Sequence, residues 1–441
     1  MTVEYTPVES IPKIVASSRA SFLTHRTQSL EFRKEQLRAL QRMVSENSEE
    51  LINAIYSDLK RTSDFEIPTC IKVCKEFIEH LETLTQNQKA SALAENDECY
   101  VRLSPLGSVL IIGAWNFPIM LVLEPLAGAI AAGNTCVIKP SEVSQTSAAV
   151  LTRLLQKYMD PQVVGVINGG AEETTALLKE RFDHIFYTGG TEVGRIVMMA
   201  AAKNLTPVTL ELGGKCPVIV SAKSDIVKAA QTIAGWKAMN CGQICLTVDY
   251  VLCPKHLQEE LIKNVIGTWQ HLYGANPKEA KNYAKVVSKR QHERLVKVLK
   301  AVEGENKIVY GGKHDVEHLY IEPTIVTNVS LNDEIMKNEI FGPILPIVAC
   351  EDLDEAIKII NSQEHALNMN IFTNDQAEVE KVLRETRSGA VNVNDVAAHF
   401  GHHDLPFGGV GHSGIGNYHG KYSIDTFSHK RAVIVRNLAH L

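Results

Sequence analysis

The sequence lacks a long apolar run able to cross a membrane, a dense cysteine pattern and an excess of one charge. Its 441 residues include 45 Lys and Arg against 51 Asp and Glu, a formal net charge of −6, and 6% are aromatic. This balance disfavours disorder and bulk electrostatic capture of nucleic acid. Because 45% of the residues are hydrophobic, the chain can bury a large core and perform small-molecule chemistry.

Cysteine usage and the chain ends indicate a compartment. The nine cysteines are odd in number and widely spaced, as is typical of a reduced interior. Residues 1–13 carry acids and form neither a secretory signal nor an Arg-rich transit peptide, and no lipidation signal or hydrophobic tail follows at the other end. We therefore expect a cytoplasmic protein without a membrane anchor.

One stretch imitates a membrane span, because residues 103–123 contain no charged side chain. Pro105 and Pro118 would break a continuous helix, and Gly107 and Gly113 bracket the β-like run Ser108–Ile112. We predict a buried strand, a loop and a new helix here, and no membrane span.

The secondary-structure pattern is α/β. Apolar residues recur at helical spacing through the first 60 residues, and short β-branched runs then alternate with helix-length segments. Predicted strands of this first sheet are Ser108–Ile112, Thr135–Ile138, Val163–Ile167, His184–Tyr187 and Val208–Leu210. Such alternation predicts a parallel sheet with helices on both faces, and ligands beyond the carboxyl ends of its strands.

A second α/β pattern follows, which predicts a second domain. Its predicted strands are Pro217–Val220, Asp249–Leu252, Ile308–Tyr310 and Ile344–Val348, with helices at Asp225–Met239 and Pro254–His271. Two further strand-like segments, Cys99–Leu103 and Thr426–Val435, could pair in a separate small sheet suited to dimerisation.

The sharpest chemical constellation is Glu211-Leu212-Gly213-Gly214-Lys215 followed by Asn240-Cys241-Gly242-Gln243-Ile244-Cys245. A cysteine thiolate can attack a carbonyl carbon, and a nearby carboxylate can serve as a base. Taken alone, any of the nine cysteines is more often a small buried hydrophobe. Spacing by itself leaves both interpretations open.

Seven motifs in order favour the chemical interpretation. They are Trp115-Asn116-Phe117-Pro118, Lys139-Pro140-Ser141-Glu142, the segment from Tyr187 to Gly194, Glu211 to Lys215, Gly242 to Cys245, Glu339-Ile340-Phe341-Gly342-Pro343 and Leu405-Pro406-Phe407-Gly408-Gly409. Together they resemble the aldehyde dehydrogenase superfamily over essentially the whole chain. The segment Thr206–Leu210 and the pair Asp249-Tyr250 are most similar to its class 3 branch, which includes fatty and aromatic aldehyde dehydrogenases.

The resemblance implies a fold and an assembly. It implies a Rossmann-like parallel-sheet cofactor domain at residues 1–97 and 105–209 and an α/β catalytic domain at 210–420. A small bridging β-sheet would come from residues 98–104 and 421–441. The assembly implied is a homodimer.

It also implies catalytic roles. Cys245 matches the nucleophile that forms a thiohemiacetal and then a thioester, and Asn116 matches the donor to the oxyanion. Glu211 matches the base that activates water for hydrolysis. Phe407 matches an apolar wall of the aldehyde tunnel. Outside the family, Asn116 could simply form a turn and Glu211 a surface charge.

Cofactor residues follow in the same way. Gly189 and Gly194, with Gly190 between them, match the family's variant of the phosphate-binding fingerprint at a helix N-terminus. A simple strand-to-helix turn is the alternative. Lys139 and Glu142 match contacts to the adenosine ribose, Glu339 a contact to the nicotinamide ribose, and Phe341 a neighbour of the ring. The acid at 142 favours NAD, and NADP stays possible.

Three departures from the family pattern concern the site. Gly190 stands where Ser is usual, residues 246–248 and 397–404 differ from the expected loops, and Cys241 lies four residues before Cys245. If these two cysteines shared a helical turn, their sulfurs could meet and form a disulfide, although Cys241 as a packing residue is the better interpretation.

The histidines of the C-terminal segment match no standard zinc spacing, so no metal site is predicted. We expect an NAD(P)-dependent aldehyde dehydrogenase acting on a small-molecule aldehyde. The alternative is a catalytically silent family member recruited as a structural or binding protein.

Overall fold

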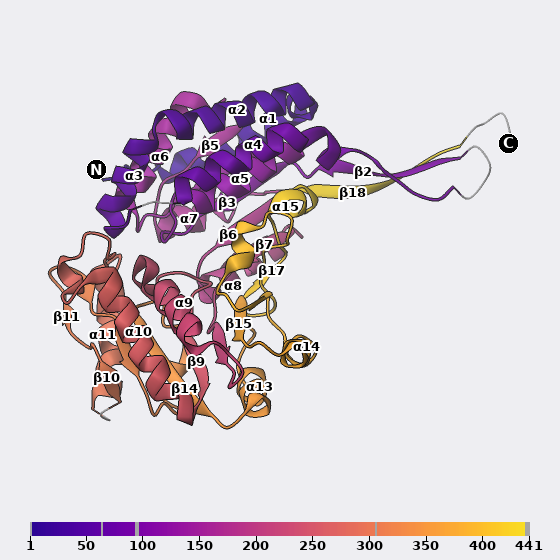
Figure 1. Ribbon diagram of the computed structural model, residues 1–441. Coiled ribbons are helices and arrows are strands. Elements are labelled where there is room, and N and C mark those ends of the chain that lie inside the picture. The colour runs from indigo at the N-terminus through magenta and orange to yellow at the C-terminus, as the bar shows by residue number, and fades with distance from the viewer. Residues whose placement is uncertain (1, 63–64, 93–96, 305–306, 437–441) are drawn as a thin grey trace.

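The computed structural model describes residues 2–62, 65–92, 97–304 and 307–436. Two helix-covered parallel sheets form the body of the molecule, and a pair of long strands projects from it (Figure 1). The fold is therefore α/β with an additional small antiparallel sheet, as predicted.

The first sheet has six strands. In spatial order they are β17 (Gly414–Ile415), β7 (Val208–Glu211), β6 (His184–Thr188), β3 (Ser108–Ile112), β4 (Thr135–Lys139) and β5 (Val164–Val166). All neighbours are parallel except β17, which runs antiparallel to β7. Strands β3, β4 and β6 are buried along their whole length because helices cover both faces. The predicted strands of this region are confirmed to within two residues at each end.

Helices surround this sheet. They are α1 (Ile11–Leu23), α2 (Leu30–Glu46), α3 (Ser48–Leu59), α4 (Glu66–Thr85), α5 (Met120–Ala132), α6 (Gln145–Tyr158), α7 (Ala171–Leu177) and α8 (Thr191–Ala202). Every residue of α5 is buried, and it packs against α2, α4 and α15 (Gly420–Thr426). The uncharged segment 103–123 is therefore the buried strand β3, a loop and the start of α5, as predicted. None of the described helices is long and apolar enough to cross a membrane.

The second sheet has seven strands. In order they are β10 (Ile308–Tyr310), β13 (Thr324–Val326), β14 (Ile344–Cys350), β9 (Tyr250–Pro254), β8 (Pro217–Val220), β15 (Asn368–Phe372) and β16 (Ala390–Val393). All pairs are parallel except β10 with β13. Its helices are α9 (Ile226–Ala238), α10 (Gln258–Tyr273), α11 (Lys289–Glu303), α12 (Glu334–Lys337), α13 (Leu353–Asn361) and α14 (Gln376–Glu385). A short hairpin of β11 (His314–Asp315) and β12 (Tyr320–Ile321) lies beside α11.

The projecting pair consists of β2 (Glu98–Pro105) and β18 (Ser428–Val435), with β1 (Gln88–Lys89) on the other edge of β2. The two long strands pair antiparallel from Ser428 opposite Pro105 to Val435 opposite Glu98. This confirms the predicted pairing of segments more than three hundred residues apart. Figure 1 shows both strands running together away from the body. Residues 437–441 of the predicted bridging segment lie outside the described residues.

Candidate active site

Cys245 follows a sharp turn that the sequence builds from a glycine and two strained residues. Asn240 and Cys241 have left-handed backbone conformations, and Gly242 has φ +69°. A Cβ on Gly242 would lie 2.3 Å from the carbonyl oxygen of Gly342, so only glycine fits. The turn ends α9 and aims the next residues, including Cys245, between the two sheets.

Two cavities meet at Cys245. One has a volume of about 610 Å³ and the other about 360 Å³, and Thr188, Glu211, Leu212 and Cys245 line both. Glu211 comes from the end of β7 and Thr188 from the end of β6, so both lie at carboxyl ends of parallel strands. A molecule in each cavity would therefore touch the same cysteine.

The larger cavity has the features of a dinucleotide cleft. Gly189 and Gly190 line it at the N-terminus of α8, where free N–H groups and the helix dipole favour phosphate. A Cβ on Gly189 would lie 2.2 Å from Tyr187 Oη, whereas one on Gly190 would meet nothing within 4 Å. A Cβ on Gly194 would lie 2.8 Å from Leu212 Cδ2, so this glycine allows α8 to pack closely on Leu212, and it does not line the cavity itself. The glycines thus leave backbone surface open to a ligand.

Glu339 and Phe341 line the opposite side of this cleft. The Phe341 ring meets Trp115 edge to face at 5.3 Å. A Cβ on Gly213 would lie 2.3 Å from Glu339 Oε2, so the carboxylate rests on bare backbone. Burial, followed by the charge of Asp249, raises the pKa of Glu339 to about 8.

The loop that carries Glu339 is held by a buried ion pair. Lys215 binds Asp249, and its Nζ also donates to the carbonyl oxygens of Ile335 at 3.0 Å and Asn338 at 3.1 Å. Asp249 Oδ1 accepts from the backbone N–H of Ile340 at 2.8 Å. Lys215, the last residue of the Glu211-to-Lys215 motif, and Asp249 therefore act together: both hydrogen-bond to the backbone of the loop that carries Glu339.

Lys139 and Glu142 lie at the end of β4, outside the lining of this cleft. Lys139 Nζ donates to Glu142 Oε2 at 3.0 Å and to the carbonyl oxygens of Pro140 and Gly169, both at 2.9 Å. Their contact with the adenosine ribose stays a prediction.

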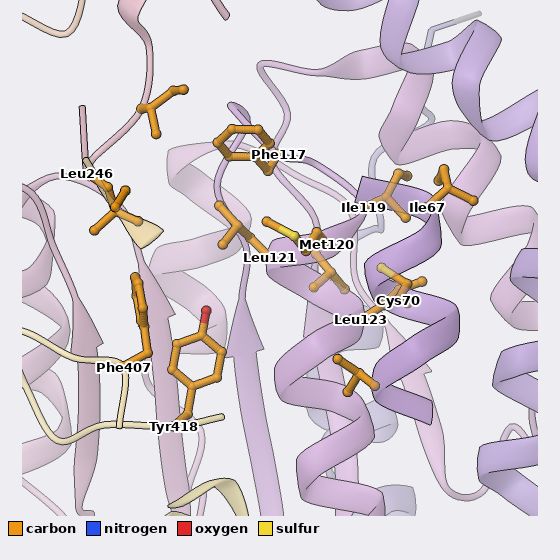
Figure 2. Packing of buried hydrophobic residues seen from close by; sticks show 14 of the residues in the cluster. Ile67, Cys70, Phe117, Ile119, Met120, Leu121, Leu123, Leu246, Phe407 and Tyr418 are labelled. Carbon is orange, nitrogen blue, oxygen red and sulfur yellow. The ribbon is translucent and has the colours of Figure 1, made fainter. Parts of the chain in front are cut away.

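The smaller cavity is mostly apolar. Figure 2 shows Leu121, Leu246, Phe407 and Tyr418 around one space, with Phe117 beside Leu121. Trp236, Met239 and Phe400 complete much of the wall. Phe407 and Leu246, the latter from the unusual segment after Cys245, both line this cavity, and the role of Phe407 as a wall of the aldehyde tunnel stays a prediction.

Burial raises the pKa values of the ionisable groups at the junction. Burial raises the pKa of the Cys245 thiol to about 12, and Glu339 and Glu211 add to the rise, while the backbone N–H groups of Cys245 and Leu246 oppose it. Glu211 is 3% exposed, neither of its carboxylate oxygens has a hydrogen-bond partner in the described part of the chain, and burial raises its pKa well above the usual value. Asn116 Nδ2 donates to the carbonyl oxygen of Gln243 at 3.2 Å, which fixes the amide in the cleft.

Cys241 points elsewhere. Its sulfur lies 3.8 Å from Tyr283 Oη, and the residue packs in a core cluster with Tyr250 and Leu252. The hypothesis that Cys241 and Cys245 share a helical turn is wrong, because left-handed residues interrupt the helix at this point. The packing interpretation of Cys241 fits the structure.

Several lining residues escaped the sequence analysis. Thr188 and Leu212 stand beside recognised motif residues, and Arg294 reaches the dinucleotide cleft from α11. Tyr418 and His403 line the apolar cavity from the loop segment 401–420. Only Glu124, the one charge inside an otherwise apolar helix, offered a signal for the polar groups behind that cavity. Among the described residues, no group of three or more His, Cys, Asp or Glu side chains could hold a metal ion.

A dinucleotide-sized cleft and an apolar cavity that open onto one cysteine are the hallmark of a nicotinamide-dependent oxidoreductase with covalent catalysis. A sequence model of the Aldehyde dehydrogenase family matches residues 1–433, and the chain belongs to this family.

Individual relatives support the same family assignment. Aldehyde dehydrogenase family 3 member A2 of Mus musculus is 46% identical, covering 95% of this chain and 87% of the mouse protein. The dimeric NADP-preferring aldehyde dehydrogenase of Canis lupus familiaris is 42% identical over 98% of this chain and 96% of its own. The substrate-bound structure of Staphylococcus aureus AldH superposes with a TM-score of 0.95 at 38% identity, covering 98% and 94% of the two chains. The protein is an NAD(P)-dependent aldehyde dehydrogenase.

Proposed function

We propose that this enzyme oxidises aldehydes with apolar chains to carboxylic acids, with Cys245 as nucleophile, Asn116 as oxyanion donor and Glu211 as base. The observation that carries the proposal is that the two cavities meet at Cys245. Cys245 and Glu211 line both the dinucleotide cleft and the apolar cavity, so a bound aldehyde carbon would lie between thiol, carboxylate and cofactor.

The residues present fit a nicotinamide dinucleotide. Bare backbone at Gly189, Gly190 and Gly213 leaves room for close approach, and Glu339 offers a carboxylate to ribose hydroxyls. When bound, the nicotinamide ring accepts the hydride that leaves the substrate carbon. The acid Glu142 supports a preference for NAD, although the canine relative is named as NADP-preferring.

The first chemical step belongs to Cys245. Its thiol gives its proton to the ionised Glu211 carboxylate, which passes it to solvent before the second step, and the sulfur adds to the aldehyde carbon. The addition places negative charge on the former carbonyl oxygen. The Asn116 amide and the Cys245 backbone N–H would donate to that oxygen, and losing one such donor typically costs about 2.7–4 kcal/mol of activation free energy. Loss of hydride then leaves a thioester on Cys245.

The second step belongs to Glu211. Its carboxylate takes a proton from water, and the water oxygen adds to the thioester carbon. The C–S bond breaks, the carboxylic acid leaves and Cys245 is regenerated. A buried carboxylate without hydrogen-bond partners suits this task, because its raised pKa makes it a stronger base once it is ionised.

The test is formation of reduced cofactor at 340 nm with NAD or NADP and aldehydes from acetaldehyde through hexanal and hexadecanal to benzaldehyde. We expect activity with apolar aldehydes, which Cys245→Ala abolishes and Cys99→Ala, in β2 away from both cavities, retains. Absence of oxidation across the panel in a protein that binds NAD would favour a silent family member instead.

The assembly we propose is a homodimer built on the projecting strands. β18 has a free edge, and Ile434 and Val435 near its end are about half exposed. A long two-stranded ribbon is barely stable alone in water. A second copy that pairs with this edge would cover it, which agrees with the word "dimeric" in the name of the canine relative.

A further inference from the structure

Four ionisable side chains form a row beside the apolar cavity. Glu76 Oε2 lies 2.6 Å from His403 Nδ1, and Glu124 Oε1 lies 3.9 Å from His403 Nε2 and 3.3 Å from His419 Nε2. Glu76 and Glu124 come from α4 and α5, whereas both histidines come from the C-terminal segment. Phe407 stacks on His419 with ring centroids 4.9 Å apart, so the row lies directly behind the cavity wall.

Glu124 and His419, the most deeply buried residues of the row, lack hydrogen bonds among the described residues. Both oxygens of Glu124 and both ring nitrogens of His419 are buried without a hydrogen-bond partner in the described part of the chain, although Glu124 Oε1 and His419 Nε2 lie 3.3 Å apart. Burial raises the pKa of Glu124 to about 8 and lowers the pKa of His419 well below its usual value, so near pH 7 both are mainly neutral. Burying such groups without partners destabilises a fold, and packing therefore does not account for them.

His403 is the member that reaches the cavity. Its side chain is 9% exposed and lines the space with Phe400 and Gly401. In the neutral ring, the tautomer with its proton on Nδ1 donates to Glu76 Oε2, and Nε2 is then the acceptor. Nε2 has no hydrogen bond among the described residues.

We propose that His403 is a specificity residue of the aldehyde cavity, which accepts a hydrogen bond at Nε2 from a hydroxyl group on the substrate's apolar chain. The inference rests on the proposed function. A neutral donor fits best: Glu76, at hydrogen-bond distance from the His403 ring, would repel an anion, and a cation would lose its hydration among apolar walls. An aldehyde carrying a hydroxyl at the right distance would therefore be preferred over an alkyl aldehyde of equal size.

The test compares ω-hydroxyalkanals of six to twelve carbons, the probe series, with n-alkanals one carbon longer. In the native enzyme we expect kcat/KM to favour the hydroxy compound about 3- to 10-fold at one or two chain lengths, the effect of one hydrogen bond. His403→Phe should remove this preference. His402→Phe, an exposed neighbour outside the cavity lining, is the matched control and should keep it.

A second variant keeps the inference testable if His403→Phe does not fold. Glu76→Leu, at a partly exposed site on α4, frees the His403 ring and should also lower the preference. No preference at any length in the native enzyme, or an unchanged preference in both His403→Phe and Glu76→Leu, would overturn the inference. Failure to oxidise even the n-alkanals would instead overturn the proposed substrate class, so the two failures are distinguishable.

Discussion

At the residue scale, burial governs the chemistry of this site. Cys245, Glu211 and Glu339 all line the cleft, and burial is the main reason why the pKa of each is raised. The thiol is therefore mostly protonated at neutral pH before substrate and cofactor bind. A resting enzyme of this kind protects its nucleophile from indiscriminate reaction.

Alkylation of Cys245 should be slow at neutral pH, because most of the thiol is protonated. With a pKa near 12, the thiolate fraction rises about tenfold per pH unit, so the rate with iodoacetamide should climb without a plateau between pH 7 and 9. Mass spectrometry of the Cys245 peptide measures the rate. A plateau below pH 8 would show that the thiol is activated in the resting protein.

Glu124 should make stability depend on pH. Its pKa is raised from 4.5 to about 8, so between these values the folded state holds a proton that the unfolded state has lost, and stability falls as pH rises. Glu124→Gln removes this linkage and should raise the unfolding free energy far more at pH 8 than at pH 5, by up to about 4 kcal/mol.

Chemical denaturation at both pH values measures the difference. The exposed change Glu49→Gln is the control and should alter stability little at either pH. An equal gain for Glu124→Gln at pH 5 and pH 8 would show that the carboxyl is not protonated in the folded state.

At the scale of elements, function depends on how strands and helices end. β6 and β7 end at Thr188 and Glu211, and α8 begins at Thr191 with Gly190 as its N-cap. Gly190 has no side chain that could cap α8. Its backbone, with φ −75° and ψ 148°, has the extended conformation in which a Ser, Thr, Asp or Asn side chain caps a helix. The departure at this position thus leaves the N-terminus of α8 less stabilised than it could be.

Gly190→Ser should stabilise the protein slightly. The new Cβ meets no atom within 4 Å, and the hydroxyl can accept from the first turn of α8, a gain of roughly 0.3–0.5 kcal/mol. Thermal unfolding should show a small rise in Tm. The neighbouring change Gly189→Ser is the contrast and should lower Tm, because its Cβ would meet Tyr187 Oη at 2.2 Å. A fall with both changes would contradict the capping argument.

At the scale of the whole molecule, the projecting ribbon of β2 and β18 stands out. Eight residue pairs join the two strands, but little of the body covers them (Figure 1). Among the described residues no strand pairs with the outer edge of β18, the edge on which we proposed that a second copy binds.

Sedimentation should therefore give about twice the chain mass of 48.7 kDa. Ile434→Pro, which removes an N–H from the exposed strand, should shift the protein toward the monomer. Lys421→Ala, on the surface of α15, is the control and should keep the dimer. A native protein that sediments as a monomer at micromolar concentration would overturn the proposed assembly.

The sequence predicted most of the architecture because its signals are local. Alternating β-branched runs and helical spacing located strands such as Ser108–Ile112 and Pro217–Val220 with no error in their bounds. The segments around Asn116, Glu211 and Cys245 stood out by motif. The helical turn hypothesised through Cys241 and Cys245 is wrong, because Asn240 and Cys241 are left-handed. The next residue, Gly242, packs against the distant carbonyl of Gly342, a contact that local sequence does not reveal.

The sequence by itself determined the family, the α/β pattern and the identity of the reactive groups, since these depend on residue type and order. Only the tertiary structure decided that two cavities meet at Cys245, that Cys241 faces Tyr283, and that Lys215 and Asp249 hold the Glu339 loop. It also brought Glu76, Glu124, His403 and His419 together from α4, α5 and the C-terminal segment. Such contacts join residues hundreds of positions apart, and packing of the whole chain sets their distances and their pKa values.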